Sequence, residues 1–516
     1  MKSRLAWLGE HGHADLVRHG LRGIEKECLR IDADGRLSRK PHPPALGAAL
    51  THPHITTDYS EALLEFVTPP CATNWETLQF LCDIHCFVAQ NLGDELLWAQ
   101  SMPCVVGPDE DVPIAYYGES NLGRMKTIYR RGLGHRYGRA MQAIAGIHFN
   151  YSLPVGFWAA YQDNEKSDQD DSAFISDQYL RMARNYRRNA WVLIYLFGAS
   201  PALCKSFPLR AGHGLEELDP HTWYLPYGTS LRMSDVGYRN KSQARLQISL
   251  NSLTEYVGGL TTAVTSSSPE YERIGVEVDG EYRQLNTNML QIENEYYAAV
   301  RPKPKAKSGS RPTVALRQGG VEYLEIRTLD LNVADPIGVN QTQLRFIEAL
   351  LLYCLFADSP PIDASEQAEI DQRELLVARE GRRPGLEIPV GGAGVLLQRV
   401  GLDLLAEITP FAELLDVTDE GYADALEQQR SAMAEPELTP SAQLLADMTT
   451  RGQRYLDFML EVSGAHAAYF RALTLAEDRK REFAELARTS VEDARDLEDN
   501  TQESLEDYLA AYFAQA

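Results

Sequence analysis

The stretch that decides the fold is Ile24–Ile31, IEKECLRI, in which charged residues are set among apolar ones. If this stretch is a strand, its side chains alternate between two faces, and Glu25 and Glu27 share one of them. Two neighbouring carboxylates are costly on a buried face without a cation and harmless on a wet face. Taken alone, the segment fits either an exposed edge or a cation-binding face.

Three further segments show the same alternation: LLEFV at 63–67, GIHFNYSLP at 146–154 and YLEIRTLD at 323–330. In each of them the apolar side chains share one face and the polar side chains share the other. Each segment alone also fits a solvated surface, where an intrastrand ion pair contributes little. Together the four segments predict one polar sheet face that carries Glu25, Glu27, Asp58, Glu65, His148, Asn150, Glu325 and Arg327.

Several carboxylates on one sheet face favour a hard divalent cation. Mg²⁺ prefers oxygen ligands and commonly bridges protein carboxylates to substrate phosphates. Without a metal, the clustered acids would repel one another and raise their own pKa values. Two or three Mg²⁺ ions would remove that repulsion, bind ATP and draw charge off a phosphoryl group in transit. The sequence has neither GxxxxGK[ST] nor GxGxxG, so nucleotide binding would rest on metals and arginine.

The pattern along the chain indicates an α+β fold, because strands and helices alternate without a regular βαβ rhythm. We expect a short helix within residues 1–22, a long helix over 172–200 and mostly helices from about 341. The turn-rich EGRRPG near residue 380 predicts a boundary between a core, residues 1–380, and a helical C-terminal region, 381–516, packed on it. The basic stretch Arg301–Pro312 fits either a flexible loop or a mobile flap over a polyphosphate.

Composition narrows the class of protein. The 516 residues carry a formal net charge of −23, which argues against non-specific binding to DNA or to anionic membranes. The N-terminal stretch has no apolar signal region, and the longest apolar runs are shorter than the ~20 residues of a membrane span. Seven scattered cysteines, none beyond Cys354, are typical of a reduced, cytoplasmic protein.

A second candidate metal site lies in LCDIHCF at 81–87. On a helix Cys82 and Cys86 share a face with His85 nearby, but a fourth ligand is not evident. Small buried residues on an amphipathic helix are the better interpretation.

The quoted segments resemble the glutamate–cysteine ligase family in its bacterial class-1 form. GIEKECLRI, LTHPHITTDYSEALLEFVTP, SMPC, GIHFNYSLP, YLFGASPALC, YLPYGTSLRMSDVGY, LQIENEYYAAVRPK and GGVEYLEIRTLDLN all occur in the family's order, across roughly residues 15–380. The resemblance implies a glutamine-synthetase-like core, a curved and mostly antiparallel sheet with flanking helices. It also implies that ATP phosphorylates the γ-carboxyl of glutamate and that the cysteine amine then attacks, the first step of glutathione synthesis.

Carried over by position, the resemblance assigns roles to individual residues. It implies metal ligation by Glu25, Glu27, Asp58, Glu65 and Glu325 with His148, catalytic roles for Arg327, Arg232 and His148, and nucleotide contacts from Arg327 and Asn150. It implies a substrate site made by Tyr59, Tyr129, Leu133, Gln142, Asn150, Arg232, Tyr238 and Tyr297. Tyr59 departs from the family's usual Phe and adds a hydroxyl to the cysteine pocket. Some relatives carry a pair of cysteines in the C-terminal half that can form a disulfide. Because no cysteine follows Cys354, this disulfide is not expected here.

The resemblance also implies Mg²⁺, with Mn²⁺ as an alternative, feedback inhibition by glutathione, and a monomer that binds neither nucleic acid nor membrane. Three other functions compete with this one. A related γ-glutamyl ligase would use a different amine on the same scaffold. A non-catalytic sensor of nucleotide or amino acid would have little need of several metal ligands. A metal hydrolase would leave the two arginines beside an aromatic pocket unexplained.

Overall fold

The computed structural model describes residues 1–10, 12–103, 105–237, 246, 248–305, 309–416 and 420–515. The predicted pocket residue Tyr238 and residues 306–308 of the basic stretch lie outside this part of the chain.

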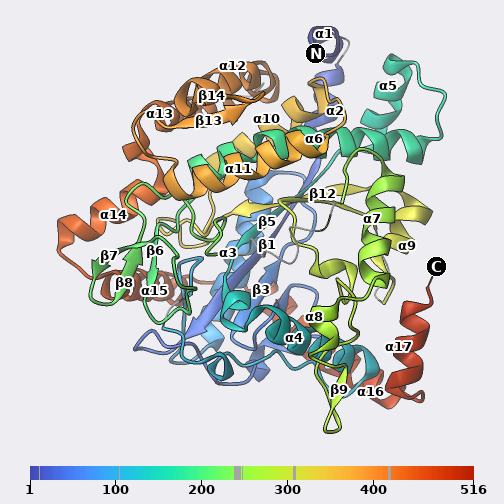
Figure 1. Ribbon diagram of the computed structural model, residues 1–516, viewed down its shortest axis with the longest axis vertical. Helices are drawn as coiled ribbons and strands as arrows, with labels where there is room; N and C mark the ends of the chain where they lie inside the picture. The colour runs from blue at the N-terminus through green and yellow to red at the C-terminus, as the bar shows by residue number, and fades with distance from the viewer. Residues whose placement is uncertain are drawn as a thin grey trace.

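The centre of the molecule is a seven-stranded antiparallel sheet (Figure 1). Its strands run in the order β11-β12-β5-β1-β3-β2, with β4 paired to the far end of β1. The bounds are β1 Leu21–Ile31, β2 Ile55–Thr57, β3 Leu63–Val67, β4 Leu96–Leu97, β5 Ile147–Ser152, β11 Val300–Lys303 and β12 Tyr323–Leu329. The sheet with its many helices confirms the predicted α+β class with a mostly antiparallel sheet.

The strand register brings the predicted polar residues onto one face. Glu27 of β1 lies opposite Glu65 of β3, and Glu25 lies opposite His148 of β5. Because residues directly opposite in antiparallel strands project to the same side, these carboxylates are neighbours. On the other side of the sheet, the intervening apolar residues Ile24, Leu64, Phe66, Phe149, Leu324 and Ile326 are fully buried.

Helices cover the apolar face of this sheet (Figure 1). The long helix α6, Asp171–Phe197, packs on β11 and β12, and α3, Asn74–Asn91, packs on β1 and β3. Helix α10, Gln341–Phe356, lies against both of these helices. The remaining helices of the first 380 residues are α1 Lys2–Gly9, α2 His13–Arg18, α4 Asn121–Tyr137, α5 Val155–Glu165, α7 Leu253–Thr265, α8 Pro269–Glu272, α9 Pro312–Gly319 and α11 Ala364–Glu380.

Helix α6 confirms the long helix predicted over 172–200, but two local predictions are wrong. The N-terminal segment forms two helices, because Gly12 adopts a left-handed backbone with φ 80° between them. Residues 301–303 of the predicted basic loop belong to the edge strand β11, where Pro302 is tolerated because an edge strand can spare one N–H donor.

The last part of the chain is mostly helical, as predicted. It contains α12 Leu397–Leu415, α13 Tyr422–Ala434, α14 Pro440–Arg451, α15 Tyr455–Ala472, α16 Glu477–Asp499 and α17 Leu505–Phe513. A hairpin, β13 Glu387–Val390 with β14 Ala393–Leu396, precedes these helices and was not predicted. One hydrophobic core runs from Leu8 to Phe483, through both of the predicted regions. The boundary at 380 stays a prediction.

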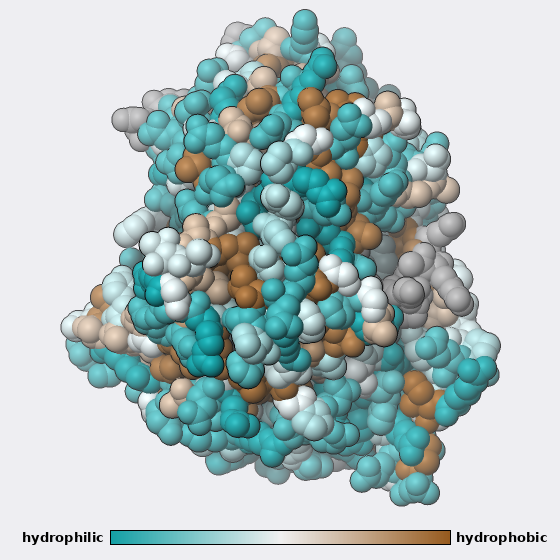
Figure 2. Space-filling model, turned by 60° about the vertical axis from the view of Figure 1, so that its left-hand side comes forward, coloured by the Kyte–Doolittle hydropathy of each residue, from teal (hydrophilic) through white to brown (hydrophobic). Residues whose placement is uncertain are grey.

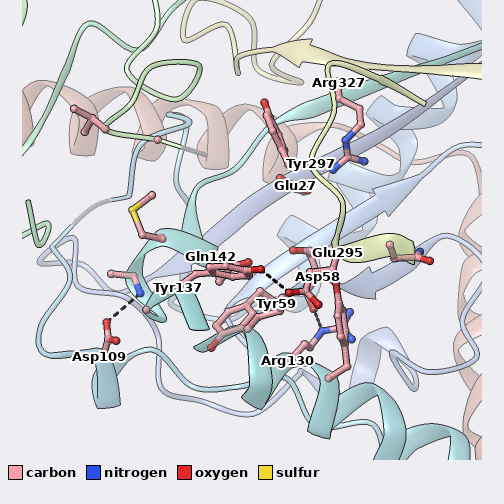
Figure 3. A pocket seen from close by; sticks show the side chains of 18 of the residues that line it. Glu27, Asp58, Tyr59, Asp109, Arg130, Tyr137, Gln142, Glu295, Tyr297 and Arg327 are labelled. Carbon is pink, nitrogen blue, oxygen red and sulfur yellow. Dashed lines mark hydrogen bonds between the residues drawn. The ribbon is translucent and has the colours of Figure 1, made fainter. Parts of the chain in front are cut away.

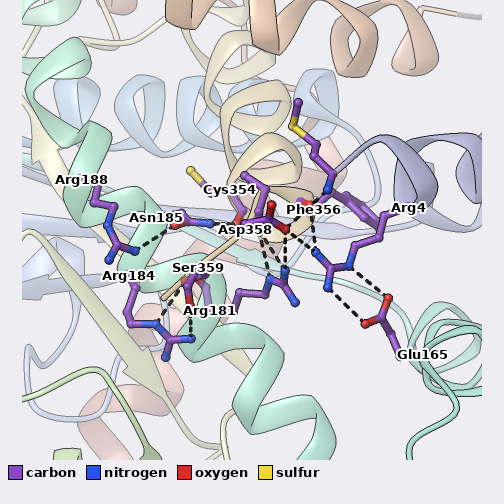
Figure 4. Close-up of polar contacts among 12 residues, drawn as sticks. Arg4, Glu165, Arg181, Arg184, Asn185, Arg188, Cys354, Phe356, Asp358 and Ser359 are labelled. Atoms are coloured by element: carbon purple, nitrogen blue, oxygen red, sulfur yellow. Dashed lines mark hydrogen bonds and ion pairs between the residues drawn. The ribbon is translucent and has the colours of Figure 1, made fainter. Parts of the chain in front are cut away.

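Small sheets complete the fold: β6 Ala202–Cys204, β8 Thr222–Tyr224 and β7 Glu216–Asp219 form one, and β9 Glu277–Val278 with β10 Glu281–Tyr282 form another. Helix α1 is fastened to this body by Arg4, whose guanidinium binds Glu165 at 3.1 Å and Asp358 at 3.2 Å (Figure 4). Arg181 and Arg184 of α6 donate to the backbone of the same 357–359 connection. This polar network therefore fixes the N-terminal segment, and it holds the residues that follow α10 against α6.

The face of the molecule in Figure 2 is largely hydrophilic, with apolar residues scattered among polar ones. Among the described residues, no helix combines the length and apolarity that crossing a membrane requires.

Candidate active site

A cavity of about 1010 Å³ lies over the polar face of the central sheet. Strands β1, β3, β5, β11 and β12 form its floor, and helix α4 with residues 292–295 forms one wall. Of the residues predicted from sequence, the cavity is lined by Glu25, Glu27, Asp58, Tyr59, Glu65, Tyr129, Leu133, Gln142, His148, Tyr297, Glu325 and Arg327. Side chains from distant parts of the sequence therefore meet in one place.

The first group of potential metal ligands is Glu25, His148 and Glu325. Their ligand atoms all lie within 4.8 Å of one another. The Nδ1 atom of His148 is 3.0 Å from Glu25 Oε2 and 3.3 Å from Glu325 Oε1. Asn150, which lies opposite Glu325 in the sheet, donates to Glu25 Oε1 at 2.9 Å. This hydrogen bonding fixes the orientation of the Glu25 carboxylate.

Cationic side chains offset the negative charge of this first group. Lys303 Nζ lies 3.2 Å from Glu325 Oε2, and Arg327 donates to Glu325 Oε1 at 2.6 Å. Burial opposes ionisation of Glu325, but these two cations outweigh it and hold its pKa well below the ordinary value. Burial and the charge of Arg327 lower the pKa of His148, so its ring is neutral at pH 7 and can offer a lone pair to a metal.

Less positive charge offsets the carboxylates of the second acidic group, which is Glu27, Asp58 and Glu65. Burial, followed by the charge of Asp58, raises the pKa of Glu27 to about 8. Burial and three neighbouring carboxylates raise the pKa of Glu65 well above its ordinary value. Both shifts are caused first by burial and then by the neighbouring carboxylates, so full ionisation of this group is unfavourable without added positive charge.

The two groups fit hard divalent cations. Their donors are carboxylate oxygens with one imidazole, the chemistry that Mg²⁺ or Mn²⁺ accepts. The raised pKa values of Glu27 and Glu65 indicate where added positive charge would stabilise the folded protein most. Glu25, His148 and Glu325, whose ligand atoms lie close together, would hold one ion, and metal ligation by Glu27, Asp58 and Glu65 stays a prediction.

The opposite wall of the cavity is aromatic and basic. Helix α4 begins after Ser120, whose hydroxyl accepts from the N–H of Gly123 at 3.2 Å, and it presents Tyr129, Arg130 and Leu133 to the cavity. Figure 3 shows Tyr59, Gln142 and Arg130 on this side, with Tyr297 and Arg327 across the cavity. The Arg130 guanidinium donates to the backbone carbonyl of Asp58, which joins helix α4 to the second acidic group.

Two predicted residues do not line the cavity. Arg232 is 1% exposed, donates to the backbone carbonyl of Arg327 at 2.9 Å and pairs with buried Asp330 at 3.8 Å. This position favours support of β12 over the direct substrate contact that the sequence predicts for Arg232. Asn150 likewise contacts Glu25 from beside the cavity. The roles predicted for both residues stay predictions.

Sequence reasoning missed the cavity residues Lys126, Arg130 and Glu295, and it noted Arg301 and Lys303 only within a basic stretch that fitted a loop or a flap. The pair Arg130–Arg131 on a helix carried no periodic signal that separated one arginine from the other. Arg301 and Lys303 did have a signal, because in a strand they share a face, but the prolines around them suggested a loop. Treating 300–303 as an edge strand would have placed both side chains beside Glu325.

The LCDIHCF segment lies on α3 as predicted, and its surroundings support the structural interpretation. His85 is buried, stacks on Phe470 and approaches Lys26 Nζ at 2.8 Å. Among the described residues, the only group of three or more His, Cys, Asp or Glu side chains arranged to hold a metal is Glu25, His148 and Glu325.

Comparison with known proteins shows which family the chain resembles. Residues 5–377 match the family model described as glutamate-cysteine ligase. Glutamate–cysteine ligases from Alcanivorax borkumensis and Azotobacter vinelandii are 47% and 48% identical to this chain, over 95% and 99% of it and 95% and 97% of their own length. A crystal structure of glutamate–cysteine ligase from Francisella tularensis in complex with AMP aligns with a TM-score of 0.91 and 36% identity, covering 96% of this chain and 97% of that one.

A bifunctional glutathione synthetase from Pasteurella multocida shares the fold, with a TM-score of 0.71 and 24% identity over 90% of this chain and 55% of that one. Fold, site and relatives together define a ligase. The chain belongs to the glutamate–cysteine ligase family.

Proposed function

We propose that this protein joins the γ-carboxyl of L-glutamate to the amine of L-cysteine with consumption of ATP. A γ-carboxylate oxygen attacks the terminal phosphorus of ATP, which gives γ-glutamyl phosphate and releases ADP. The cysteine amine then attacks the acyl carbon, phosphate leaves, and the nitrogen loses a proton. The observation that carries this proposal is the carboxylate-rich sheet face with Arg327 and Lys303 at its edge, in a chain of this family.

Divalent cations, Mg²⁺ or alternatively Mn²⁺, fit the two acidic groups, and when bound they would neutralise carboxylates and phosphate oxygens. The protein's own part is to hold these ligands in place. Asn150 fixes the Glu25 carboxylate through a hydrogen bond of 2.9 Å to its Oε1. The N–H of Gly146 donates to Glu27 Oε2 at 2.7 Å and orients that carboxylate in the same way.

Arg327 is the residue best placed to contact the transferred phosphoryl group. Its guanidinium lies at the cavity surface and already donates to Glu325, so its direction is fixed before substrate arrives. A planar fork of donors suits phosphate oxygens better than a point charge does. Lys303 and Arg301 line the cavity on the neighbouring strand and add positive charge for a nucleotide.

The aromatic wall is suited to the amine substrate. Tyr59, Tyr129 and Leu133, with Tyr297 across the cavity, give a small thiol apolar contact with few polar partners. Tyr238, predicted for the same pocket, falls outside the described residues. Gln142 lies at the edge of this wall and can orient a bound amino acid. Feedback inhibition by glutathione follows from the same arrangement, because glutathione contains both substrate moieties.

A monomer in the reducing cytoplasm, without nucleic-acid or membrane partners, completes the proposal. Cys28, Cys71, Cys82, Cys86, Cys204 and Cys354 are all free thiols, which supports the reducing compartment.

The test is ADP release from ATP, Mg²⁺ and glutamate, with cysteine or other small amines added in turn and products identified by mass. Strong stimulation by cysteine with formation of γ-glutamylcysteine is the expected result. Turnover with a different amine but not with cysteine would show that this amine, and not cysteine, is the second substrate. A folded protein that binds nucleotide but turns over no amine would refute the ligase activity.

A further inference from the structure

Helix α17 packs against the outer side of the cavity wall. Its residues Leu505, Leu509 and Tyr512 form a hydrophobic cluster with Met125 and Ile128 of α4 and with Leu285 and Ile292. This cluster is separate from the main core. Met125 and Ile292 also line the cavity. A single layer of side chains therefore separates α17 from the cavity.

Hydrogen bonds hold α17 at its N-terminal end. The side-chain amide of Asn121 donates to the carbonyl of Glu503 at 3.0 Å, which fastens α17 to the start of α4. The hydroxyl of Tyr282 donates to Glu506 Oε1 at 2.8 Å. This end of α17 thus joins helix α4 to the segment that leads into residues 285–297.

Arg311 holds the other end. Its guanidinium donates to the carbonyls of Phe513 and Gln515, both at 3.3 Å, and its backbone N–H donates to the side chain of Gln515 at 3.0 Å. Arg311 is 6% exposed and also binds the carboxylate of Glu293 at 3.0 Å. Glu293 begins the short stretch that carries Asn294, Glu295 and Tyr297 into the cavity.

We propose that α17 positions the wall made by α4 and residues 285–297, and so sets affinity for the amine substrate, with Leu509 and Arg311 as positioning residues. The choice of substrate rests on the proposed function, because Tyr129 and Leu133 lie on this wall. The acidic groups lie on β1, β3, β5 and β12, with Asp58 in the connection between β2 and β3, and none of these segments contributes a residue to the α17 cluster. Loosening α17 should therefore weaken amine binding and spare the nucleotide and metal side.

The first experiment compares Leu509→Ala with the wild type in the full chain with Mg²⁺. The KM for cysteine should rise about 5- to 20-fold, which corresponds to about 1–2 kcal/mol of binding free energy. The KM for ATP and kcat at saturating cysteine should change by less than about twofold. Hydrogen exchange should become faster in residues 121–137 and 285–297.

The matched control is Leu444→Ala in α14. Leu444 is as buried as Leu509, at 4% against 7% exposed, and it belongs to the main core and does not line the cavity. This variant should lower the unfolding midpoint without changing the KM for cysteine. Equal rises in both KM values with Leu509→Ala, or unchanged hydrogen exchange in the wall, would overturn the proposal.

A milder variant keeps the test valid if Leu509→Ala does not fold. Gln515→Ala removes only the contacts to the backbone of Arg311 and Gly309, and it should raise the KM for cysteine by about two- to fivefold. An unchanged KM for cysteine and unchanged exchange in this variant would refute the role of α17. Absence of cysteine turnover in the wild type would refute the proposed function instead, and hydrogen exchange alone would then decide the role of α17.

Discussion

Replacing Glu27 by Gln should stabilise the metal-free protein and abolish its function. Glu27 is 5% exposed, and burial with the charge of Asp58 raises its pKa from 4.5 to about 8. The folded state therefore keeps a proton that the unfolded chain releases. Below pH 4.5 Glu27 is protonated in both states, and the stability that its protonated form provides is fully present. As pH rises from 4.5 toward 8, the unfolded chain ionises while the folded state keeps the proton, so the folded protein loses this stability.

The size of the effect follows from the gap between pH and the ordinary pKa. At pH 7 the ionisable Glu27 costs up to about 3 kcal/mol, because each pKa unit corresponds to about 1.4 kcal/mol. Glutamine cannot ionise, and its carbonyl oxygen can still accept the hydrogen bond from Gly146. At pH 5 the advantage of the variant should shrink to under about 1 kcal/mol.

The assay is urea unfolding of both proteins at pH 5 and pH 7 with a chelator, and again at pH 7 with saturating Mg²⁺. The expected result is a higher midpoint for Glu27→Gln at pH 7 without metal, together with a smaller gain from Mg²⁺ and loss of turnover. Glu10→Gln, a change at an exposed carboxylate, is the control and should shift neither midpoint. A destabilised Glu27→Gln protein that gains as much from Mg²⁺ as the wild type would refute the reasoning.

Four other substitutions test separate parts of the account. Glu65→Gln should fold and lose most ATP-dependent turnover; near-normal turnover would remove Glu65 from the metal ligands. Arg327→Lys should lower kcat/KM at least about 100-fold, because lysine lacks the fork of donors, and wild-type kinetics would make Arg327 structural. Tyr59→Phe removes a buried hydroxyl that has no hydrogen-bond partner among the described residues, so stability should stay equal or rise by up to about 1 kcal/mol, and a tenfold higher KM for cysteine would instead show that the hydroxyl binds substrate. Glu348→Ala leaves buried Arg22 without its partner and should cost about 3–5 kcal/mol in urea unfolding, which an unchanged midpoint would contradict.

The sheet face was predictable because alternation is a local signal. In β3, β5 and β12 most of the polar residues of the site sit between apolar neighbours, and in β1 Glu25 and Glu27 are two residues apart, so the sequence alone shows which side chains share a face. The order of these strands is set by long-range pairing, such as Glu27 with Glu65, which no local pattern reports. The family resemblance gave what the alternation could not, namely the role that each residue on this face is expected to have.

Other elements could not be predicted because their residues occur in more than one kind of structure. Val300–Lys303 contains a proline and basic residues typical of a loop, yet it serves as an edge strand. The β13–β14 hairpin turns on Gly391 and Gly392, both with positive φ, in a region that otherwise predicts helices. Arg130 reaches the site only because α4 packs beside the sheet, so its role could be seen only in three dimensions.

The central claim is that ATP activates the γ-carboxyl of glutamate on this sheet face before the amine attacks. The most direct test uses glutamate whose γ-carboxylate carries ¹⁸O, with ATP, Mg²⁺ and cysteine, followed by mass analysis of the inorganic phosphate. The account predicts that one labelled oxygen passes from glutamate to phosphate for each γ-glutamylcysteine formed. Phosphate without label, in a reaction that still makes γ-glutamylcysteine, would contradict it.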